Sequence, residues 1–515
     1  MAHEDDVVAS WIETASPMLR ALVDRTPLAS IQRLNGIQAL VDEGLRALEE
    51  EFFNAVFERL GERAAEVAGR CSVCRFGCER ERKTVRVRTT RCTLDVEVWR
   101  YRCRPCRFNR SPVREWLGLE SGATTSGLDR ALTALSAQMS FGSAAAQMAE
   151  HHGHEVDRTL VERRTYAVGR DAVAYLEERE TERLRDVMDT VGVRPGAERV
   201  FVQVDSGAVP IGKLVRPKRN PKDKAQELTA VRRLPKGRRP KTKREVRVAV
   251  AWRPGQVDDK VVNLHIAPLN HPEVTGENMY IAALEAGLGD NTHVHCTCDM
   301  AQWQPLQFDE QFGAQPKATL CADFFHTLEY VAGAAKAIQP DTNKTKSWIA
   351  MQARRLKDGD REAILADLRS HRCTGRACPT TDKDECVVKA AHRYLTRNGR
   401  HMDYPSFIAE GLPIGSGEVE GRIRHIVRRR LDVPGDWRED NLALLTALLT
   451  IRHSGWWDDF WAWQDRRDKK RFERRLLGEG LNRFRGPRKP RLVTEGTESL
   501  DLDGLSPVFQ AGCMA

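Results

Sequence analysis

Acidic residues at four positions of this 515-residue chain could together bind metal ions. Asp205 ends the β-run RVFVQVDSG, and Asp299 ends a second run, NTHVHCTCDM. Glu418 and Glu420 stand just ahead of the arginines in GLPIGSGEVEGRIRHIVRRR. An acid at the end of an apolar strand costs folding free energy, so it is expected to have a function there. Ligand-binding and active sites commonly form at the edges of α/β sheets. Two strand-end aspartates and one helix glutamate would hold two divalent cations about 4 Å apart, and their hard oxygens favour Mg²⁺ or Mn²⁺.

The choice between Glu418 and Glu420 stays open at this point. Residues two positions apart lie about 200° apart around a helix, so both cannot face the same metals. A further acid, Asp323, heads the segment DFFHTLEY and places His326 one turn later on the same helix face. Each acid also has a simpler explanation, as a turn residue, a helix cap or an ion-pair partner of neighbouring arginines. Only their combination predicts a metal site.

Two C-x-x-C pairs predict a second and different metal site. Cys71 and Cys74 form one pair, Cys103 and Cys106 form the other, and the intervening KTVRVRTTRCTLDVEVW alternates like a β-hairpin. Four thiolates suit one tetrahedral Zn²⁺, so the pattern predicts a structural zinc ribbon. Buried free cysteines and a redox pair are the alternatives. The chain has thirteen cysteines, an odd number, and no signal-peptide pattern, which favours reduced thiols or metal over disulfides.

Basic residues gather in three segments that could contact a polyanion. In SFGSAAAQMAEHHGHEVDRTLVERR, a break at Gly153 and a cap at Asp157 predict two helices, either a helix-turn-helix or an ordinary packed pair. The stretch GKLVRPKRNPKDKAQELTAVRRLPKGRRPKTKRE would bind phosphates without sequence preference, unless it is a merely solvated loop. The third segment is the arginine run after Glu420. The candidate DNA contacts are Arg158, Arg163, Arg164, Arg216, Lys218, Arg219, Arg232, Arg233, Arg238, Arg239, Arg424, Arg428 and Arg429.

Composition indicates a soluble protein with hydrophobic cores. Apolar residues make up 41% and charged residues 30% of the chain, which is ordinary for a globular protein. The net charge of +9 favours a polyanion as partner. No stretch reaches the roughly 18 uncharged apolar residues of a membrane span, and the start MAHEDDVVAS lacks a signal-peptide pattern. We therefore expect a cytoplasmic protein without a membrane partner.

The spacing of apolar residues divides the chain into helical and β segments. Period-two runs in the middle of the chain predict an α/β core, and helical spacing predominates on either side of it. The predicted order is an N-terminal helical region (1–66), the zinc ribbon (67–115), a helix-turn-helix-like helical region (120–190), the first part of the core (197–329) with a basic insert (212–246), a helical insertion (330–410), the last part of the core (411–465) and a basic, then loose tail (466–515).

One long block of the sequence resembles a known family. The segment YLTRNGRHMDYPSFIAEGLPIGSGEVEGRIRHIVRRRLDVPGDW, followed by HSGWWDDFW, resembles the C-terminal part of bacterial insertion-sequence transposases of the Kra type, which are relatives of the eukaryotic Mutator elements. The family pattern there is approximately Y-P-x-F, then G-x-P-I-G-S-G-x-V-E, a basic helix and a tryptophan. The DFFH segment, the C-x-x-C pairs and the LGL at 117–119 also resemble this family. The resemblance covers most of the chain from about residue 40 to 463.

The resemblance implies an RNase H-like catalytic core with a DDE triad, interrupted by a helical insertion before the glutamate. Carried onto this chain, it makes Asp205, Asp299 and Glu420 the catalytic metal ligands. It makes Asp323 and His326 an accessory D-x-x-H pair.

The sequence departs from the family pattern beside the first two acids. Asp205 is followed by Ser206 and Gly207 where the family usually has D-G. Asp299 stands in C-D-M-A, with Met300 after it, where the family usually has G-D-G-A. These changes keep the carboxylates but remove glycines, which affects the local turn geometry.

The function implied by the resemblance is that of a DNA transposase, a bacterial and nucleoid-associated protein. It would bind the terminal inverted repeats of its element, cut a phosphodiester at each end with metal-activated water, and join the 3′-hydroxyl to target DNA. Holding two ends together implies a homodimer or a higher oligomer, and no G-x-x-x-x-G-K-[ST] loop for ATP is present. The alternatives are a catalytically inactive, domesticated DNA-binding relative, another RNase H-like nuclease such as a resolvase, and a purely structural zinc-ribbon protein.

Overall fold

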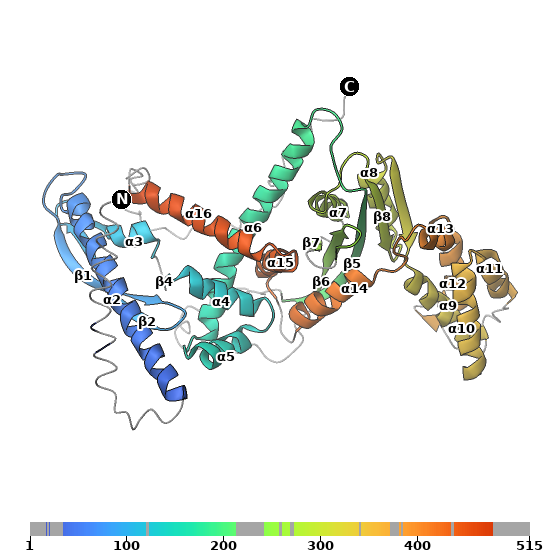
Figure 1. Cartoon of the computed structure of the whole chain (residues 1–515), viewed down its shortest axis with the longest axis horizontal. Coiled ribbons are helices and arrows are strands. Elements are labelled where there is room, and N and C mark those ends of the chain that lie inside the picture. Colours follow the sequence, from blue (N-terminus) through green and yellow to red (C-terminus); the bar gives the residue numbers. More distant parts are fainter. Residues whose placement is uncertain are drawn as a thin grey trace, which may run out of the picture.

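The computed structural model is an elongated mixed α/β molecule with two larger sheets in separate places (Figure 1). It describes residues 34–119, 123–212, 242–256, 260–267, 272–338, 341–370, 381–382, 385–433 and 437–476, together with residues 17 and 20. A four-stranded sheet lies at one end, a five-stranded sheet lies nearer the middle, and a group of helices forms the other end (Figure 1). No helix among the described residues is long and apolar enough to cross a membrane.

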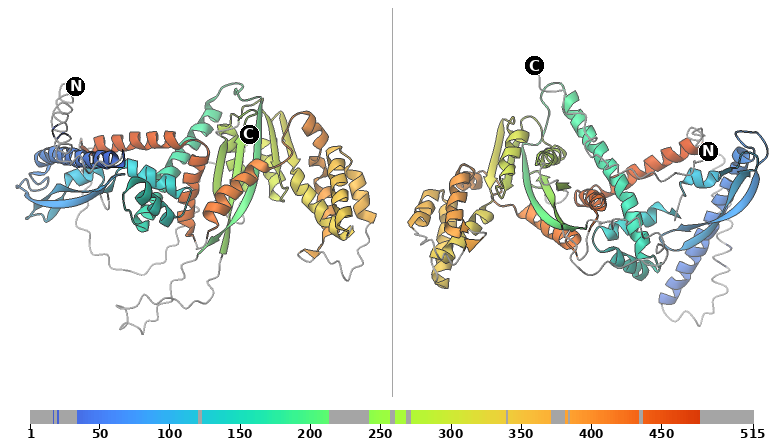
Figure 2. Two further views of the ribbon diagram at one scale, coloured as in Figure 1. Left: turned by 60° about the horizontal axis from the view of Figure 1, so that its bottom comes forward. Right: turned by 180° about the vertical axis from the view of Figure 1, so that it is seen from behind.

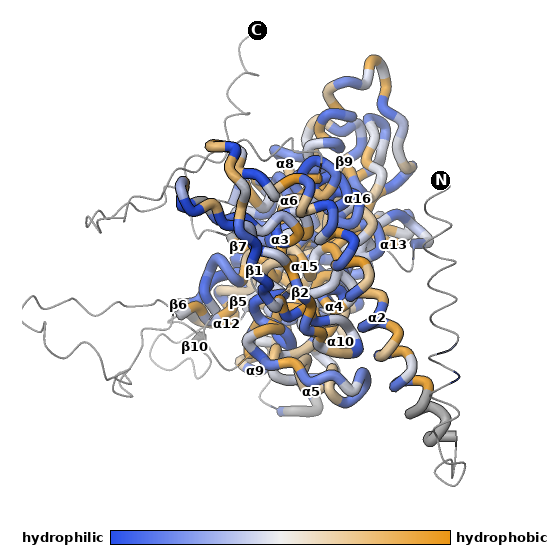
Figure 3. The backbone as a smooth tube through the Cα atoms, turned by 90° about the vertical axis from the view of Figure 1, so that its left-hand side faces the viewer, coloured by the Kyte–Doolittle hydropathy of each residue, from blue (hydrophilic) through white to orange (hydrophobic). Residues whose placement is uncertain are grey.

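The N-terminal module packs one long helix, α2 (Leu34–Ala68), against the four-stranded mixed sheet β3-β2-β1-β4. Strands β1 and β2 are antiparallel, and β4 runs parallel to β1. Alternate residues of β2 such as Val96 and Val98 share a buried cluster with Ala64 of α2, as expected for a sheet with one covered face. Hydrophobic and hydrophilic stretches alternate along α2 (Figure 3). The other elements are β1 (Glu79–Arg88), β2 (Thr93–Cys103), β3 (Phe108–Arg110), α3 (Pro112–Leu117) and β4 (Ala123–Thr124).

Three helices follow this module, and two of them contain the predicted break and cap. Gly153 ends α5 in the left-handed conformation, with φ of 58°. The Asp157 carboxylate caps α6 by accepting a hydrogen bond from the Leu160 N–H at 2.8 Å. The two-helix prediction is therefore confirmed, whereas DNA reading by this pair stays a prediction. The helices are α4 (Ser126–Ser136), α5 (Phe141–His152) and α6 (Arg158–Asp189).

The larger sheet has five strands in the order β7-β6-β5-β8-β9. Strands β5, β6 and β7 are antiparallel neighbours, while β8 and β9 continue the sheet parallel to β5. All six residues of β8 are buried, as expected for an inner strand covered on both faces. The strands are β5 (Arg199–Ile211), β6 (Thr242–Trp252), β7 (Val261–Ala267), β8 (His293–Cys298) and β9 (Lys317–Ala322); α7 (Glu273–Glu285) and α8 (Trp303–Phe312) lie in the connections.

The structure moves the predicted C-terminal boundary of the basic insert, which adjoins this sheet. Residues 242–246, assigned to the basic insert, belong to strand β6, which pairs with β5 as far as Ile211. The rest of the insert, 213–241, lies outside the described residues. The strands predicted from the period-two runs are confirmed as β5, β6, β7 and β8, and β9 is an additional strand.

Helices occupy most of the described chain between β9 and the G-S-G turn and stand beside the β9 edge of the sheet (Figure 2). Among these helices, α12 packs against α9 and α11. The elements are α9 (Phe324–Ile338), α10 (Thr342–Lys357), α11 (Arg361–Ser370), the two-residue strands β10 (Thr381–Asp382) and β11 (Glu385–Cys386), α12 (Val387–Asn398), the 3₁₀ turn η2 (Gly399–His401) and α13 (Tyr404–Ala409).

The chain then returns to the sheet through α14 (Gly417–Arg422), which continues directly into a π-helix, η3 (Ile423–Leu431). Ile423 and Val427 are buried where η3 lies against β5, and arginines occupy the exposed side. Long π-helices are rare and are frequent near functional sites. The arginine run predicted to contact DNA is therefore attached to the larger sheet.

The C-terminal helices join the two halves of the molecule. Helix α15 (Glu439–His453) packs against α6 and β7, and α16 (Trp457–Leu476) extends back to the N-terminal module (Figure 1). There Phe472 and Leu476 pack against the buried cluster of that module. The sequence interpretation began a basic, then loose tail at 466, whereas α16 continues to Leu476, because these apolar side chains anchor a helix among the basic residues.

Gly207 lets the π-helix lie directly on strand β5. A Cβ atom at this position would stand 2.6 Å from Val427 Cγ1, far inside a normal contact. The glycine of the Asp205-Ser206-Gly207 sequence is therefore required by packing. Because η3 continues α14, this contact also fixes the helix that carries Glu420.

We expect Gly207→Ala to lower the free energy of unfolding by about 1–3 kcal/mol, since the added methyl group overpacks the contact with Val427. Urea-induced unfolding would measure the change. Gly421→Ala is the matched control, because nothing lies within 4 Å of its added Cβ and alanine favours a helix. The double variant with Val427→Ala should recover part of the loss; equal stability of Gly207→Ala and the unmodified protein would contradict the packing argument.

Candidate active site and metal centre

The side chain of Gln203 joins strand β5 to the segment that carries the glutamates. Its Nε2 donates to the Gly415 carbonyl at 2.8 Å, and its Oε1 accepts from the Val419 N–H at 3.1 Å. Gln203 is buried, so these bonds are shielded from water. Asp205 lies two residues along the same strand and on the same face. The two bonds therefore hold the start of α14 beside Asp205.

Strand register brings Asp299 to the same level of the sheet as Asp205. In the parallel pair β5 and β8, Gln203 is the register partner of Thr297. Asp205 and Asp299 each follow these partners by two residues. Asp205 lies within β5, which continues to Ile211, so the prediction that it ends a strand is wrong, whereas Asp299 directly follows the end of β8. Both carboxyl groups therefore lie near the C-terminal end of β8 and on one face of the sheet.

Burial raises the pKa of Asp205 to about 6, with further increases from the nearby charges of Asp299 and Glu420. The Ser206 N–H, which donates to Asp205 Oδ1 at 2.6 Å, and the nearby His326 lower the pKa. Mutual repulsion of this kind is expected where several carboxylates share a site without a cation. The three acids predicted from distant parts of the sequence thus form one electrostatic group.

The pKa of Asp205 predicts that stability falls as the pH rises, in buffer without added divalent metal. The folded carboxyl has a pKa of about 6 against an ordinary value of 3.8, so between these values the folded state binds more protons than the unfolded state. The free energy of unfolding then decreases with pH over this window. Asp205→Asn should remove the decrease and stabilise the protein at about pH 7 by on the order of 2 kcal/mol.

Thermal unfolding followed by circular dichroism at several pH values measures this effect. Asp95→Asn is the control, because hydrogen bonding to Arg86 lowers the pKa of Asp95. That shift has the opposite sign, so Asp95→Asn should not stabilise the protein. An unchanged pH dependence in Asp205→Asn would show that Asp205 does not titrate as the site predicts.

Glu418 and Glu420 face different neighbours. Lys260 Nζ lies 2.6 Å from Glu418 Oε1 in an ion pair. Glu420 Oε1 instead accepts a hydrogen bond from Ser416 Oγ at 2.9 Å, and its charge acts on Asp205. The structure therefore groups Glu420 with the two aspartates.

Asp323 organises the site from a fully buried position. Its Oδ1 accepts from the His326 N–H at 2.5 Å, which caps α9, and its Oδ2 accepts from the Ser416 N–H. One carboxylate thus ties α9 to the G-S-G turn. His326 is partly exposed, lies 3.4 Å from Glu329 and is close enough to act on Asp205. The predicted accessory pair therefore divides into a positioning residue, Asp323, and a histidine at the acid cluster.

Two residues of α12 that the sequence did not single out hold the loop after Asp299. Tyr394 donates from its hydroxyl to the Asp299 carbonyl at 3.1 Å, and Arg397 Nη2 donates to the Met300 carbonyl at 3.0 Å. Met300 has φ of 64°, in the left-handed region that favours glycine. Methionine therefore adopts a glycine-like turn here, supported by α12. The only signal in the sequence was the three-residue spacing of Tyr394 and Arg397 on one helix face.

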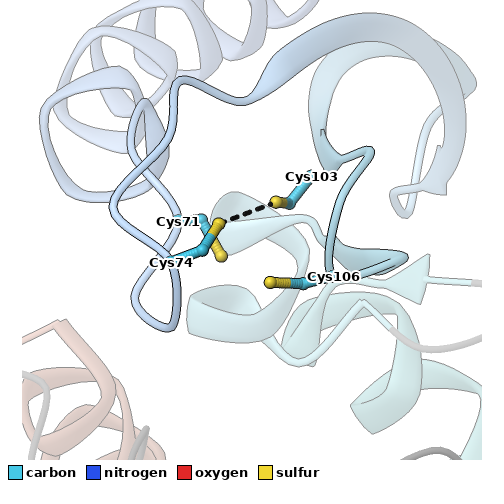
Figure 4. A group of neighbouring side chains, drawn as sticks. All are labelled: Cys71, Cys74, Cys103 and Cys106. Carbon is cyan, nitrogen blue, oxygen red and sulfur yellow. Dashed lines mark hydrogen bonds between the residues drawn. The ribbon is translucent and has the colours of Figure 1, made fainter.

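Four cysteine side chains converge from two turns of the N-terminal module (Figure 4). Their Sγ atoms all lie within 4.8 Å of one another, and those of Cys74 and Cys103 are 3.4 Å apart. Each C-x-x-C pair is followed by a residue with positive φ, Arg75 at 63° and Arg107 at 52°, so the two turns share a shape. Hydrogen bonds from backbone N–H groups, that of Cys74 first, lower the pKa of Cys71 to about 6. The predicted four-cysteine cluster is confirmed, and it could bind a structural zinc ion.

Within the described part of the chain, these cysteines are the one set of three or more metal-type ligands whose atoms lie within 4.8 Å of one another. The carboxylates of Asp205, Asp299 and Glu420 are neighbours but do not reach that spacing. Their hard oxygens and their repulsion suit a divalent cation, which would have to draw them together. Cys92 stands outside the cysteine cluster, with its Sγ 3.7 Å from Glu49 Oε2.

The candidate DNA contacts fall into three groups. Five of them are exposed, two on α6 and three on η3. Arg164 is only partly exposed: its Nε donates to the buried Asp129 at 2.8 Å and joins α6 to α4, and its contact with DNA stays a prediction. The exposed residues are Arg158, Arg163, Arg424, Arg428 and Arg429; those outside the described residues are Arg216, Lys218, Arg219, Arg232, Arg233, Arg238 and Arg239.

No family model matches this chain, and no curated protein matches it. Function must therefore be inferred from the residues themselves, from their geometry and from the resemblance of the sequence motifs.

Proposed function

We propose that this protein is a DNA transposase that cuts and joins phosphodiesters with divalent cations held by Asp205, Asp299 and Glu420. The observation that carries the proposal is the grouping of these three acids near the end of β8 in the five-stranded sheet. An acid such as Asp205, whose pKa is raised by burial and by neighbouring carboxylates, is typical of a functional site. The DNA would be the terminal inverted repeats and a target, bound by a homodimer or a higher oligomer.

Three further features support a transposase core of the RNase H-like type. In the five-stranded mixed sheet, Asp205 lies within β5 and Asp299 directly follows the neighbouring strand β8. Helices follow β9 and precede the glutamate, as the resemblance implies for a helical insertion. The resemblance also implies a glutamate in the G-S-G-x-V-E segment, and Glu420 is the one that faces the aspartates.

The residues of the chain suggest how the reaction would proceed. Bound Mg²⁺ or Mn²⁺ would supply the positive charge that activates the attacking oxygen and stabilises the leaving oxygen. Asp205 lies within β5, Asp299 directly follows the neighbouring strand β8, and Gln203 holds the start of α14, so the three carboxylates are brought near one another before the substrate arrives. The exposed arginines of η3 would bind phosphates of the DNA next to the reacting bond.

The proposal is tested by incubating the purified protein with Mn²⁺ and a labelled duplex that carries the element's own end. The expected result is cleavage at that end, with no cleavage of a duplex whose end sequence is scrambled. Cleavage of branched DNA regardless of end sequence would instead indicate a resolvase-like nuclease. Specific binding without cleavage in either Mg²⁺ or Mn²⁺ would indicate an inactive DNA-binding relative.

A further inference from the structure

A cavity of about 370 Å³ lies against the loop that follows Asp299. One wall is the loop itself, and the other is formed by α9 and α12, which contribute His326, Tyr330, Tyr394 and Asn398. Sites for small ligands have volumes of roughly 300–1,000 Å³. The cavity adjoins the acid cluster, because Asp299 lines it and acts on Asp205.

Aromatic rings form one side of this cavity. The rings of Tyr330 and Tyr394 are stacked, with centroids 4.3 Å apart and planes at 16°. The His326 ring stands edge-on to both, at 5.3 Å from Tyr330 and 5.9 Å from Tyr394. The hydroxyl of Tyr394 is bonded to the Asp299 carbonyl, which fixes this ring relative to the acid cluster. Fixed aromatic side chains of this kind are surfaces on which nucleic-acid bases stack.

Asn398 adds a hydrogen-bond donor that the protein does not use. Its side chain is 3% exposed, and its Nδ2 has no acceptor among the described residues. An unsatisfied buried donor costs about 1–3 kcal/mol, which a ligand with a suitable acceptor would recover. Asparagine amides are complementary to the hydrogen-bonding edges of bases. The unused donor and the aromatic side therefore point to the same kind of ligand.

Positive charge at the cavity favours a nucleotide over a neutral molecule. Arg393 and Arg397 line it one turn apart on α12, and both are exposed. Arg397 uses Nη2 to hold the Met300 carbonyl, and a guanidinium carries five N–H donors. The remaining N–H donors of Arg397 can bind a phosphate that is attached to a stacked base.

We propose that this cavity takes one unstacked nucleobase of the DNA strand next to the reacting phosphodiester. The inference rests on the proposed function and adds to it a base-binding subsite formed by the helices between β9 and α14. Tyr330 provides the stacking surface, Asn398 the donor to the base edge, and Arg397 the contact to the adjoining phosphate. Unstacking a base costs a few kcal/mol, and stacking on an aromatic side chain returns roughly 1–3 kcal/mol.

Photocrosslinking to the full chain tests this subsite without depending on cleavage. The probe is a single-stranded oligonucleotide with one 5-iodouracil, a base that crosslinks to neighbouring aromatic side chains on irradiation. Mass spectrometry should locate the crosslink at Tyr330 or His326. Tyr330→Ala should abolish the crosslink at position 330 and weaken oligonucleotide binding by roughly 5- to 150-fold. Tyr330→Phe keeps the ring and is the matched control, which should retain both.

Oligonucleotide affinity, by fluorescence anisotropy, and Mn²⁺-dependent cleavage are measured on the same preparations. Asn398→Ala should weaken oligonucleotide binding by about 5-fold or more, since it removes the donor from the base edge. Cleavage with crosslinks only outside the cavity, or full affinity in both Tyr330→Ala and Asn398→Ala, would overturn the subsite and leave the transposase proposal standing. Absence of any DNA binding would overturn both.

Discussion

Asp205→Ala, Asp299→Ala and Glu420→Ala should each reduce metal-dependent DNA cleavage by at least about 10²-fold, because each removes a ligand of the cations that stabilise the transferring phosphoryl group. DNA binding should persist, since it depends on the exposed arginines and not on the acids. Gel-based cleavage of a labelled duplex in Mn²⁺, alongside anisotropy for binding, separates the two effects. Loss of binding in parallel with cleavage would mean that the substitutions disturb the fold.

Glu418→Gln is the matched control for Glu420→Gln. Both substitutions replace a carboxylate of the same short helix with an amide of nearly the same shape. Glu418 forms an ion pair with Lys260, whereas the charge of Glu420 acts on Asp205. We expect full cleavage in Glu418→Gln and severe loss in Glu420→Gln. The reverse pattern would show that the helix turns by about half a turn when DNA and metal bind, and that Glu418 is the third ligand.

The elements with strong local patterns were predictable from the sequence. The alternating valines of β5 predict a strand. Gly153, which adopts a left-handed conformation, and Asp157, whose side chain caps a helix, predict where α5 ends and α6 begins. Strand β9 was missed because KATLCA has a single β-branched residue, Thr319, and becomes a strand through pairing with β8. The C-terminal part of α16 was missed because most of its residues are charged, and only Phe472 and Leu476 pack against the N-terminal module.

The acids of the site were predictable as residue types, but their supporting residues were not. Gln203 looks like any polar residue in a strand until the fold brings Gly415 and Val419 to it. Spacing alone left Glu418 and Glu420 open, and only the resemblance selected Glu420; the ion pair that sets Glu418 apart comes from Lys260, which is distant in sequence. Tyr394 and Arg397 act on the Asp299 loop only after α12 has folded back against the sheet. Interactions between distant segments carry this information, and spacing within one segment does not.

Cys103→Ser should remove zinc from the protein and unfold the N-terminal module. The four Sγ atoms lie within 4.8 Å of one another, and a structural zinc site contributes about 10–16 kcal/mol of apparent folding free energy in small domains. The folding free energy lost with one of the four thiolates should therefore exceed the stabilisation that the small hydrophobic cluster around Val96 and Val98 provides. Elemental analysis of the purified protein should give one zinc per chain, and far less in Cys103→Ser.

Cys92→Ser provides the matched control, because Cys92 lies outside the four-cysteine cluster and should leave the zinc content unchanged. The damage in Cys103→Ser should also spread along α16, whose Phe472 and Leu476 pack against the same module. Limited trypsin digestion should then cut α16 near its basic C-terminal turns, while the five-stranded sheet stays resistant. Cys103→Ser with unaltered zinc content and an intact α16 would contradict both the metal assignment and the role of this helix as the link between the two sheets.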